Sequence, residues 1–369
     1  DNQAPAISSR HLQTQPADFS YARLAHPPAT FAHEKLKYDV RMPAARRFIE
    51  EAGLNEWHRG QTQNVGLIVQ GGLYNSLMRA LEKMNLLDAQ GESLLPILVL
   101  NVVYPLVPDQ LVAFAQGKRA VLVLEEGQPE FIEHELASHL QRAACHTVVQ
   151  GKTYLPMGGE YNVEVLVQSL SAFVADHDPD CTVAPAQAYM QNLEATRQQV
   201  RDALQVPVPP RPPNFCTGCP ERPVFAALKL AQREVGPLHI SADIGCHSFA
   251  TFEPFSFGHS ILGYGMSMAS SAAVKNFSSK RPIAIMGDGG FWHNGLLSGV
   301  SSALLNQGDG VLVIMKNGYT SATGTQETVS TPGSEAKRVA EGSSATGMEM
   351  TIEQTLRGMG VKWLRTVHN

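Results

Sequence analysis

The chain has 369 residues, of which 43% are hydrophobic and 17% charged, and a formal net charge of −5. This length favours two domains of medium size, and the composition is that of a folded globular protein. The negative charge gives no attraction for nucleic acid or an anionic membrane, and no apolar run is long enough to span a bilayer. Five cysteines favour reduced thiols in a cytoplasmic enzyme over a disulfide framework. Because the chain begins without Met and ends on a strand-like run, we expect it to be part of a longer polypeptide.

The first part of the chain is predicted to contain a helical or irregular segment, residues 1–61, and an α/β domain, residues 62–205. In that domain three apolar runs of strand length alternate with helical patterns: NVGLIV, LPILVL and AVLVL. A helical stripe at 3.6-residue spacing follows the first run: Leu77, Met78, Ala80, Leu81 and Met84. Strands that alternate with helices predict a parallel sheet covered on both faces.

A proline-rich linker is predicted at residues 206–215, because five prolines between positions 207 and 213 favour a stiff, extended backbone. The alternative is a long surface loop within one domain. The alternation of strands and helices starts again after the linker, in residues 216–369. We therefore predict an α/β protein with two doubly wound parallel-sheet domains.

Asp288 and Asn317 each follow an apolar run, and they lie 29 residues apart (317 − 288). If the two runs are neighbouring parallel strands, both residues lie at the ligand-binding edge of the sheet. Glycines around Asp288 allow a ligand to approach the backbone, and N–H groups at the start of the next helix favour a diphosphate. A carboxylate beside a diphosphate requires a cation, and Mg²⁺ binds carboxylate, carbonyl and phosphate oxygens. The pattern predicts a magnesium–diphosphate site in a turn that lies at a strand end and outside the core; the alternative is an ordinary glycine turn.

With these residues in place, the chain resembles the thiamine-diphosphate-dependent 2-oxoacid ferredoxin oxidoreductases, most of all the indolepyruvate type. In the second domain the resemblance depends on CTGCPERP, ADIGCHSF, LGYGMSMASS, GDGGFWHNG and MKNGYTSATG, which resemble the thiamine-diphosphate-binding domain of that family. In the first domain it depends on YPL and VLVLEEGQPEFIE, in a unit similar to the C-terminal domain of transketolase. It covers nearly the whole chain, and is weakest before residue 35 and after residue 330. Two positions depart from it: Lys316 stands where relatives often have Asp, and Gly289 where many have Ser.

The resemblance implies a role for each matching residue. The Mg²⁺ ligands would be Asp288, Asn317 and the carbonyl of Tyr319. The diphosphate would be held by Gly287, Gly289 and Gly290, and the rest of the cofactor would be lined by Gly245, Cys246, Gly265 and Ser267. His293 and His247 are candidate acid–base groups near the reacting carbon, the alternative being polar side chains satisfied by the backbone.

Three cysteines of the second domain form a candidate metal site: Cys216, Cys219 and Cys246. Thiolates suit Zn²⁺ or an iron–sulfur cluster, which usually take four ligands. The resemblance favours a [4Fe–4S] cluster, with His247 or a cysteine on another segment as the fourth ligand. The alternatives are a structural zinc and thiols that only line the cofactor pocket.

The predicted function is oxidative decarboxylation of an aryl pyruvate such as indolepyruvate, with coenzyme A as acceptor and ferredoxin as the electron acceptor. The resemblance also requires a glutamate that activates the aminopyrimidine, and the family takes it from a separate pyrimidine-binding domain. No third α/β unit is present, and Glu125 and Glu126 are interpreted as interdomain contacts. We therefore expect half an active site, completed by a missing domain or second subunit in an oligomer. The alternatives are a non-oxidative thiamine-diphosphate decarboxylase or synthase, and a non-catalytic module.

Overall fold

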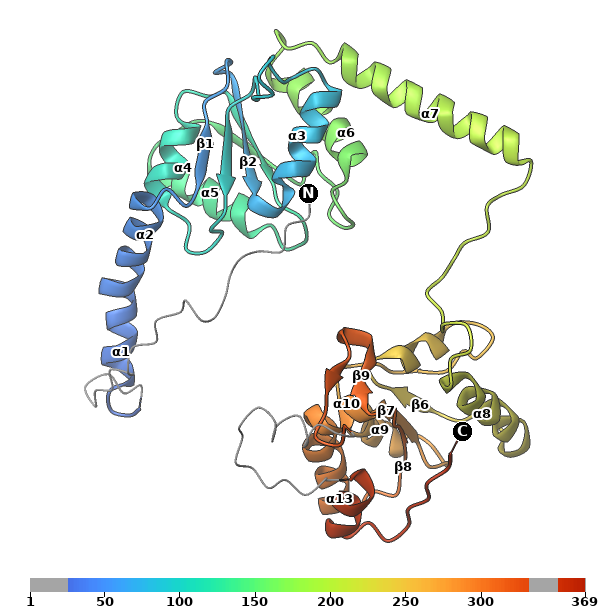
Figure 1. The fold of residues 1–369 in the computed structure, drawn as a ribbon. Coiled ribbons are helices and arrows are strands. Elements are labelled where there is room, and N and C mark those ends of the chain that lie inside the picture. Colours follow the sequence, from blue (N-terminus) through green and yellow to red (C-terminus); the bar gives the residue numbers. More distant parts are fainter. Residues whose placement is uncertain (1–25, 332–350, 369) are drawn as a thin grey trace, which may run out of the picture. The chain divides into compact units, whose positions relative to one another are not determined.

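The computed structural model describes residues 26–331 and 351–368 (Figure 1). The chain separates into two compact units, Asp1–Pro207 and Val208–Asn369. Each unit has a central sheet of mostly parallel strands with helices packed against it, so the predicted α/β class is confirmed. Among the described residues, no helix combines the length and apolar character needed to cross a membrane.

The sheet of the first unit has the strand order β1-β3-β2-β4-β5. Its strands are β1 (Glu56–His58), β2 (Val65–Gln70), β3 (Ile97–Leu100), β4 (Ala120–Leu124) and β5 (Val148–Gln150). All neighbouring pairs are parallel except β1 with β3, which is antiparallel. The three long apolar runs form the centre of this sheet. The predicted helical or irregular character of residues 1–61 is wrong for β1, whose three residues are too few to show a strand period.

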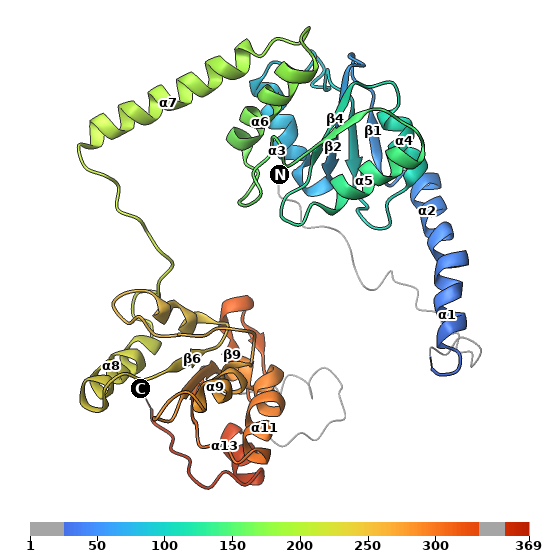
Figure 2. The ribbon, with the colours of Figure 1, turned by 180° about the vertical axis from the view of Figure 1, so that it is seen from behind.

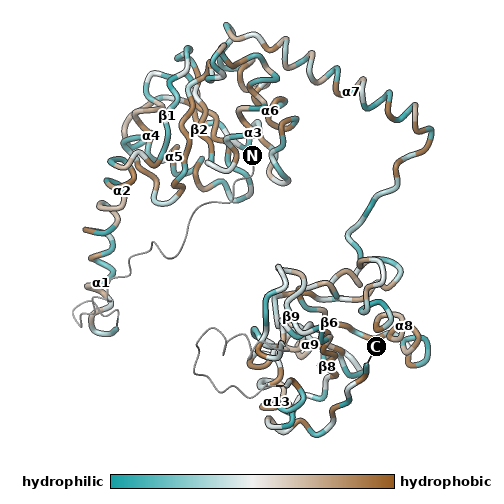
Figure 3. Tube along the Cα trace, viewed as in Figure 1, coloured by the Kyte–Doolittle hydropathy of each residue, from teal (hydrophilic) through white to brown (hydrophobic). Residues whose placement is uncertain are grey.

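Helices cover both faces of this sheet (Figures 1 and 2). Those of the first unit are α1 (Thr30–Leu36), η3 (Lys37–Arg41), α2 (Met42–Glu51), η4 (Gly71–Leu73), α3 (Tyr74–Lys83), α4 (Pro108–Ala115), α5 (Phe131–Arg142), α6 (Val163–His177) and α7 (Ala184–Leu204). In Figure 3, β2 is hydrophobic along its length, whereas α7 alternates between hydrophobic and hydrophilic residues. This contrast is expected of a strand buried on both faces and of a helix with a large solvent-exposed surface.

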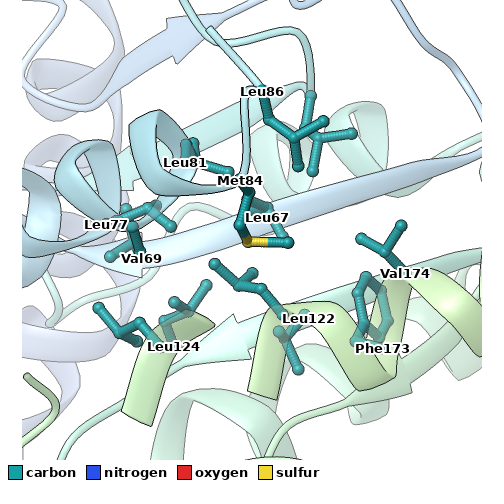
Figure 4. Packing of buried hydrophobic residues seen from close by; sticks show 14 of the residues in the cluster. Leu67, Val69, Leu77, Leu81, Met84, Leu86, Leu122, Leu124, Phe173 and Val174 are labelled. Atoms are coloured by element: carbon teal, nitrogen blue, oxygen red, sulfur yellow. The ribbon is translucent and has the colours of Figure 1, made fainter. Parts of the chain in front are cut away.

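The core between α3, α6 and the sheet contains the residues predicted from the helical stripe. Leu77, Leu81 and Met84 are at most 1% exposed. Figure 4 shows them beside side chains of β2 and β4 and of Phe173 from α6. The helical spacing therefore identified the buried face of α3 correctly.

Glu125 follows β4 and makes its hydrogen bonds inside the first unit. Its two carboxylate oxygens accept hydrogen bonds from the main-chain nitrogen of Ile132 at 3.1 and 2.9 Å, at the start of α5, and the side chain is 5% exposed. Glu126 accepts a hydrogen bond from the nitrogen of Tyr161 at 2.7 Å, also within this unit. Both glutamates thus have hydrogen-bond partners within the first unit, and their interpretation as interdomain contacts stays a prediction. A carboxylate at a helix N-terminus is stabilised by the unpaired N–H groups there.

The second unit is built on a three-stranded parallel sheet with the order β6-β7-β8. Its strands are β6 (Ile240–Ala242), β7 (Ile283–Gly287) and β8 (Val311–Met315), and a small hairpin contains β9 (Tyr319–Thr320) and β10 (Gln326–Glu327). Its helices are α8 (Glu221–Val235), η5 (Cys246–Thr251), α9 (Ser267–Lys275), α10 (Asp288–Gly290), η6 (Phe291–Ser301), α11 (Ser302–Leu305), η7 (Ser321–Thr323) and α13 (Ile352–Gly358). Strand β7 is central, so its carboxyl end lies between those of β6 and β8.

Consecutive residues of β7 face opposite layers of this unit. Ile285 packs in a cluster with Phe225 of α8, and Met286 packs in another with Phe291 and with Ile352 of α13. Figures 1 and 2 show α8 and α13 on opposite sides of the sheet. Because both faces of β7 are covered, the turn after it is also held among buried residues.

Candidate cofactor site

Asp288 is the first residue after β7, and its carboxylate connects the ends of two neighbouring strands. Oδ1 accepts a hydrogen bond from the nitrogen of Gly289 at 3.0 Å, and Oδ2 accepts one from the nitrogen of Gly318 at 2.7 Å. The second bond crosses from the end of β7 to the loop that follows β8. The structure therefore brings Asp288 and the Asn317 loop together at one edge of the sheet.

The prediction that Asp288 lies outside the core is wrong, because its side chain is only 2% exposed. Burial raises the pKa of this carboxyl, and the hydrogen bonds from the backbone of Gly318, Gly289 and Asn317 act in the opposite direction. Among the described residues no Lys, Arg or His forms an ion pair with it. A buried carboxylate without a cationic partner, and with lone pairs left on both oxygens, fits a divalent cation.

An open pocket lies in front of this turn. Nine of the predicted residues line it: Gly245, Cys246, His247, Gly287, Asp288, Gly289, Gly290, Asn317 and Tyr319. The loop after β8, residues 319–323, also lines it. The lining thus combines glycines and main-chain groups with hydroxyl-bearing residues, which suits a phosphate-bearing ligand.

Asp243 directly follows β6, the third strand that ends at this edge of the sheet. The sequence analysis did not select it. It is 0% exposed, and both of its carboxylate oxygens accept a hydrogen bond from the nitrogen of Gly265, at 2.8 and 2.7 Å. Oδ1 also accepts one from the nitrogen of Ile244 at 2.9 Å. Asp243 therefore fixes Gly265 beside the turn after β7, since a Cβ on Gly290 would lie 2.4 Å from Oδ2 of Asp243. The only sequence signal was an acidic residue directly after an apolar run.

His247 lies in the pocket wall and is 3% exposed. Burial lowers the pKa of its imidazole to about 4, with a smaller opposing effect of a hydrogen bond to the backbone of Asp243. The ring is therefore neutral at neutral pH. Its Nε2 is buried and has no hydrogen-bond partner among the described residues. Because the other ring nitrogen donates its proton to the backbone of Asp243, Nε2 of the neutral ring is available to a ligand as an acceptor.

Glu221 is a second pocket residue that the sequence analysis did not select. It begins α8, and burial raises the pKa of its carboxyl to about 7. Its Oε2 is buried without a hydrogen-bond partner among the described residues. The sequence offered one signal, a carboxylate two residues after Cys219, but gave no indication of its burial.

Three predicted residues lie next to the pocket rather than in its lining: Gly265, Ser267 and His293. Ser267 is 1% exposed at the start of α9. His293 is exposed, and its ring packs against that of Tyr264 with centroids 5.0 Å apart. Gly265 and His293 thus contact residues that line the pocket. Ser267 is the first residue of α9, which follows Gly265 in the chain.

The three cysteines of the second unit have different environments. Cys246 lines the pocket, Cys219 packs against the buried cluster around Phe215, and Cys216 is exposed. In the part of the chain that the structure describes, no group of three or more His, Cys, Asp or Glu side chains is arranged to hold a metal ion. This finding does not concern the predicted Mg²⁺ ligands, because they are one carboxylate, one side-chain amide and one main-chain carbonyl rather than three His, Cys, Asp or Glu side chains.

Comparison with known proteins places this pocket in a recognised domain. Residues 243–369 match the family described as thiamine pyrophosphate enzyme, C-terminal TPP binding domain. The match begins at Asp243 and includes the turn after β7 and the loop after β8.

The whole chain is similar to subunit IorA of indolepyruvate oxidoreductase from several archaea. It is 29% identical to the subunit from Methanothermobacter thermautotrophicus over 349 residues, which are 92% of this chain and 50% of the relative. It is 29% identical to that of Archaeoglobus fulgidus over 362 residues, 97% of this chain and 51% of the relative. For Thermococcus kodakarensis the identity is 26% over 330 residues, 84% of this chain and 46% of the relative. The chain therefore spans about half the length of these relatives.

These findings confirm the resemblance on which the site residues were selected. Residues 243–369 match the C-terminal TPP-binding domain of thiamine pyrophosphate enzymes, within a chain that resembles indolepyruvate oxidoreductase subunit IorA along most of its length.

Proposed function

We propose that this chain is part of a thiamine-diphosphate- and Mg²⁺-dependent oxidoreductase that decarboxylates indolepyruvate or a similar aryl pyruvate. In the balanced reaction, the 2-oxoacid and coenzyme A give acyl-CoA, CO₂, one proton and two electrons, which pass to ferredoxin. Thiamine diphosphate supplies the nucleophilic carbon that allows the carboxylate to leave as CO₂. The names of the relatives support the substrate class.

The observation that carries this proposal is the position of Asp288. Its buried carboxylate accepts hydrogen bonds from Gly289 and Gly318, so one group connects the turn after β7 to the loop after β8. In this arrangement Mg²⁺ would be held by Asp288, Asn317 and the carbonyl of Tyr319. The side-chain oxygen of Asn317 accepts a hydrogen bond from the nitrogen of Tyr319 at 3.2 Å, so the loop keeps it close to the other two.

The glycines after β7 would hold the diphosphate. The turn Gly287–Gly290 opens into the helical segment α10–η6, whose first N–H groups favour an anion. Mg²⁺ would screen the diphosphate from the carboxylate of Asp288. The site would therefore require metal and diphosphate together.

His247 would act on the substrate as a neutral group. Its pKa of about 4 keeps Nε2 free of positive charge at neutral pH. Nε2 would accept a proton or a hydrogen bond from the substrate, since the other ring nitrogen donates to the backbone of Asp243. His293 is exposed and packs beside Tyr264, so it would act as an acid–base group at the rim of the pocket.

The activating glutamate and the remaining electron carriers would come from a second domain or subunit. Glu125 cannot supply this carboxylate without releasing the start of α5, because both of its oxygens are hydrogen-bonded there. Because Cys216, Cys219 and Cys246 are not arranged as a metal site in the described part of the chain, the iron–sulfur centre that passes electrons to ferredoxin would also belong to another domain or subunit. The subunit name of the relatives supports a multi-subunit enzyme.

Calorimetric titration of the chain with thiamine diphosphate, in the presence and absence of Mg²⁺, tests the proposal. Binding that depends on Mg²⁺ is expected, and its absence would exclude both this enzyme and a non-oxidative thiamine decarboxylase or synthase, leaving a non-catalytic module. The two enzyme classes separate when a pyrimidine-binding partner is added. Reduction of ferredoxin with indolepyruvate and coenzyme A supports the oxidoreductase, whereas aldehyde or ketol formation without electron transfer supports the alternative.

A further inference from the structure

Gly289 lies where two hydroxyl groups converge. A Cβ built on this residue would be 2.4 Å from Oη of Tyr264 and 2.5 Å from Oγ1 of Thr320. Both distances are far shorter than any real contact to a Cβ, so the two hydroxyls fill the space that a side chain at this position would take. They come from separate elements: Tyr264 precedes α9, and Thr320 ends β9.

The two hydroxyls are hydrogen-bonded to one another, and both residues line the pocket. Tyr264 lies among other residues that fix the geometry of the site. The next residue, Gly265, is held by Asp243, and the ring of Tyr264 packs on that of His293. These contacts fix the ring, so its hydroxyl has a defined position beside the turn after β7.

Tyr264 is a proton donor at neutral pH. Burial raises the pKa of its phenol, and the nearby carboxylates of Asp243 and Asp288 raise it further. If the hydroxyl of Thr320 donates to Oη, the phenolic O–H remains available to an acceptor in the pocket. A diphosphate oxygen is an acceptor of the kind that such a donor binds strongly, because hydrogen bonds to a charged group are stronger than neutral ones.

We infer that the hydroxyl of Tyr264, held in place by the hydroxyl of Thr320, donates a hydrogen bond to the diphosphate group, at the place where a side chain on residue 289 would otherwise stand. The inference rests on the proposed function, since it concerns the same pocket. It adds one binding residue and one positioning residue to the site and explains why residue 289 is glycine in this chain. The two hydroxyls lie 2.4 and 2.5 Å from the Cβ that a serine would have there, so hydroxyl groups remain beside this turn although relatives often have Ser at this position.

Titration calorimetry with two probes tests the inference: Mg²⁺–thiamine diphosphate, and Mg²⁺–pyrophosphate, which lacks the thiamine end. Tyr264→Phe keeps the ring and removes only the hydroxyl. We expect about a tenfold loss of affinity for both probes, the effect of one hydrogen bond to a charged acceptor. Tyr189→Phe, in the first unit, is the matched control and should leave both affinities unchanged. The melting temperature of each ligand-free variant reports whether the second unit is folded.

A relocation experiment gives an independent readout. Gly289→Ser alone should lower both the affinity and the melting temperature, because the new Cβ collides with the two hydroxyls. Combined with Tyr264→Phe and Thr320→Ala, the same serine should recover most of the affinity lost by the Tyr264→Phe/Thr320→Ala pair. The experiments distinguish failure of the proposed function from failure of this inference. If the unaltered chain binds neither probe, the proposed function and this inference both fall. If it binds both, but Tyr264→Phe binds them within twofold of it, only the inference is overturned.

Discussion

The carboxylate of Asp243 holds the nitrogen of Gly265 with both oxygens, at 2.8 and 2.7 Å, and so joins the end of β6 to the loop before α9, 22 residues further along the chain (265 − 243). Gly265 has a φ of +78°, a conformation that side chains rarely adopt. A Cβ there would also lie 2.7 Å from the carbonyl oxygen of Gly290 and from the nitrogen of Gly295. The glycine thus satisfies a backbone requirement and a packing requirement at once.

Gly265→Ala should therefore destabilise the second unit more than the same change at an uncrowded glycine. Gly360 is the matched control, because it has a φ of +94° and nothing within 4 Å of an added Cβ. We expect Gly360→Ala to cost about 1 kcal/mol and Gly265→Ala at least about 2 kcal/mol more. Urea denaturation measures both. A Trp57→Phe background leaves Trp292 and Trp363 of the second unit as the fluorescent reporters. Equal costs would contradict the crowding argument.

Asp288→Ala should abolish Mg²⁺-dependent binding of thiamine diphosphate. We expect a loss of at least about 3 kcal/mol, more than one charge-assisted contact usually contributes, which corresponds to a Kd more than about 100-fold higher. Because Asp288 is buried and accepts two backbone hydrogen bonds, the variant should also lose about 1–3 kcal/mol of folding stability. Asp309→Ala is the control, since Asp309 is exposed before β8, at the opposite edge of the sheet. Unchanged cofactor affinity in Asp288→Ala would refute the metal assignment.

His247 and Glu221 should affect the pH dependence of stability in opposite directions. The folded pKa of His247, about 4, is below its ordinary value of 6.5, so its contribution is present above pH 6.5 and is lost as the pH falls toward 4. The folded pKa of Glu221, about 7, is above its ordinary 4.5, so its contribution is present below pH 4.5 and is lost as the pH rises through 7. The effect is at most about 3 kcal/mol for His247 and smaller for Glu221, which is partly in contact with solvent.

Single variants separate the two effects. Glu221→Gln should make the free energy of unfolding fall more steeply than in the unaltered chain when the pH is lowered from about 7 to about 5. His247→Asn should make the same change shallower or reverse its sign. Urea denaturation of the second unit at both pH values, in the Trp57→Phe background, gives the slopes. Parallel slopes for all three proteins would show that neither group has a shifted pKa.

The chain alone should not activate thiamine diphosphate. Asp288 and Asn317 would hold the diphosphate end, but the carboxylate of Glu125 is occupied at the start of α5. Exchange of the C2 proton of the cofactor, followed by NMR in D₂O, should proceed at about the rate of the free cofactor. It should accelerate when a pyrimidine-binding domain or subunit is added. Fast exchange with the chain alone would show that its active site is complete.

The long apolar runs were sufficient to predict the central strands of both sheets, because a strand buried on both faces is hydrophobic at every position. The short edge strands β1 and β5 were not predicted, since three residues show no period and their pairing depends on partners distant in sequence. In the site, Asp288 and Asn317 were found because each follows a predicted strand. Asp243 and Tyr264 were missed for a different reason. Their roles depend on hydrogen bonds and close packing between segments that only the folded chain brings together.

The hydrogen bond between Gly318 and Asp288 gives the site its own spectroscopic signal. A cation that binds Oδ2 of Asp288 would share this oxygen with the N–H of Gly318, which donates to it at 2.7 Å, and would change the polarisation of that hydrogen bond. In ¹⁵N-enriched protein, the amide resonance of Gly318 should therefore shift on addition of Mg²⁺–diphosphate. The measurement needs no substitution and no attached probe. The shift of this one amide would then report whether the metal position is occupied in the chain without substitutions.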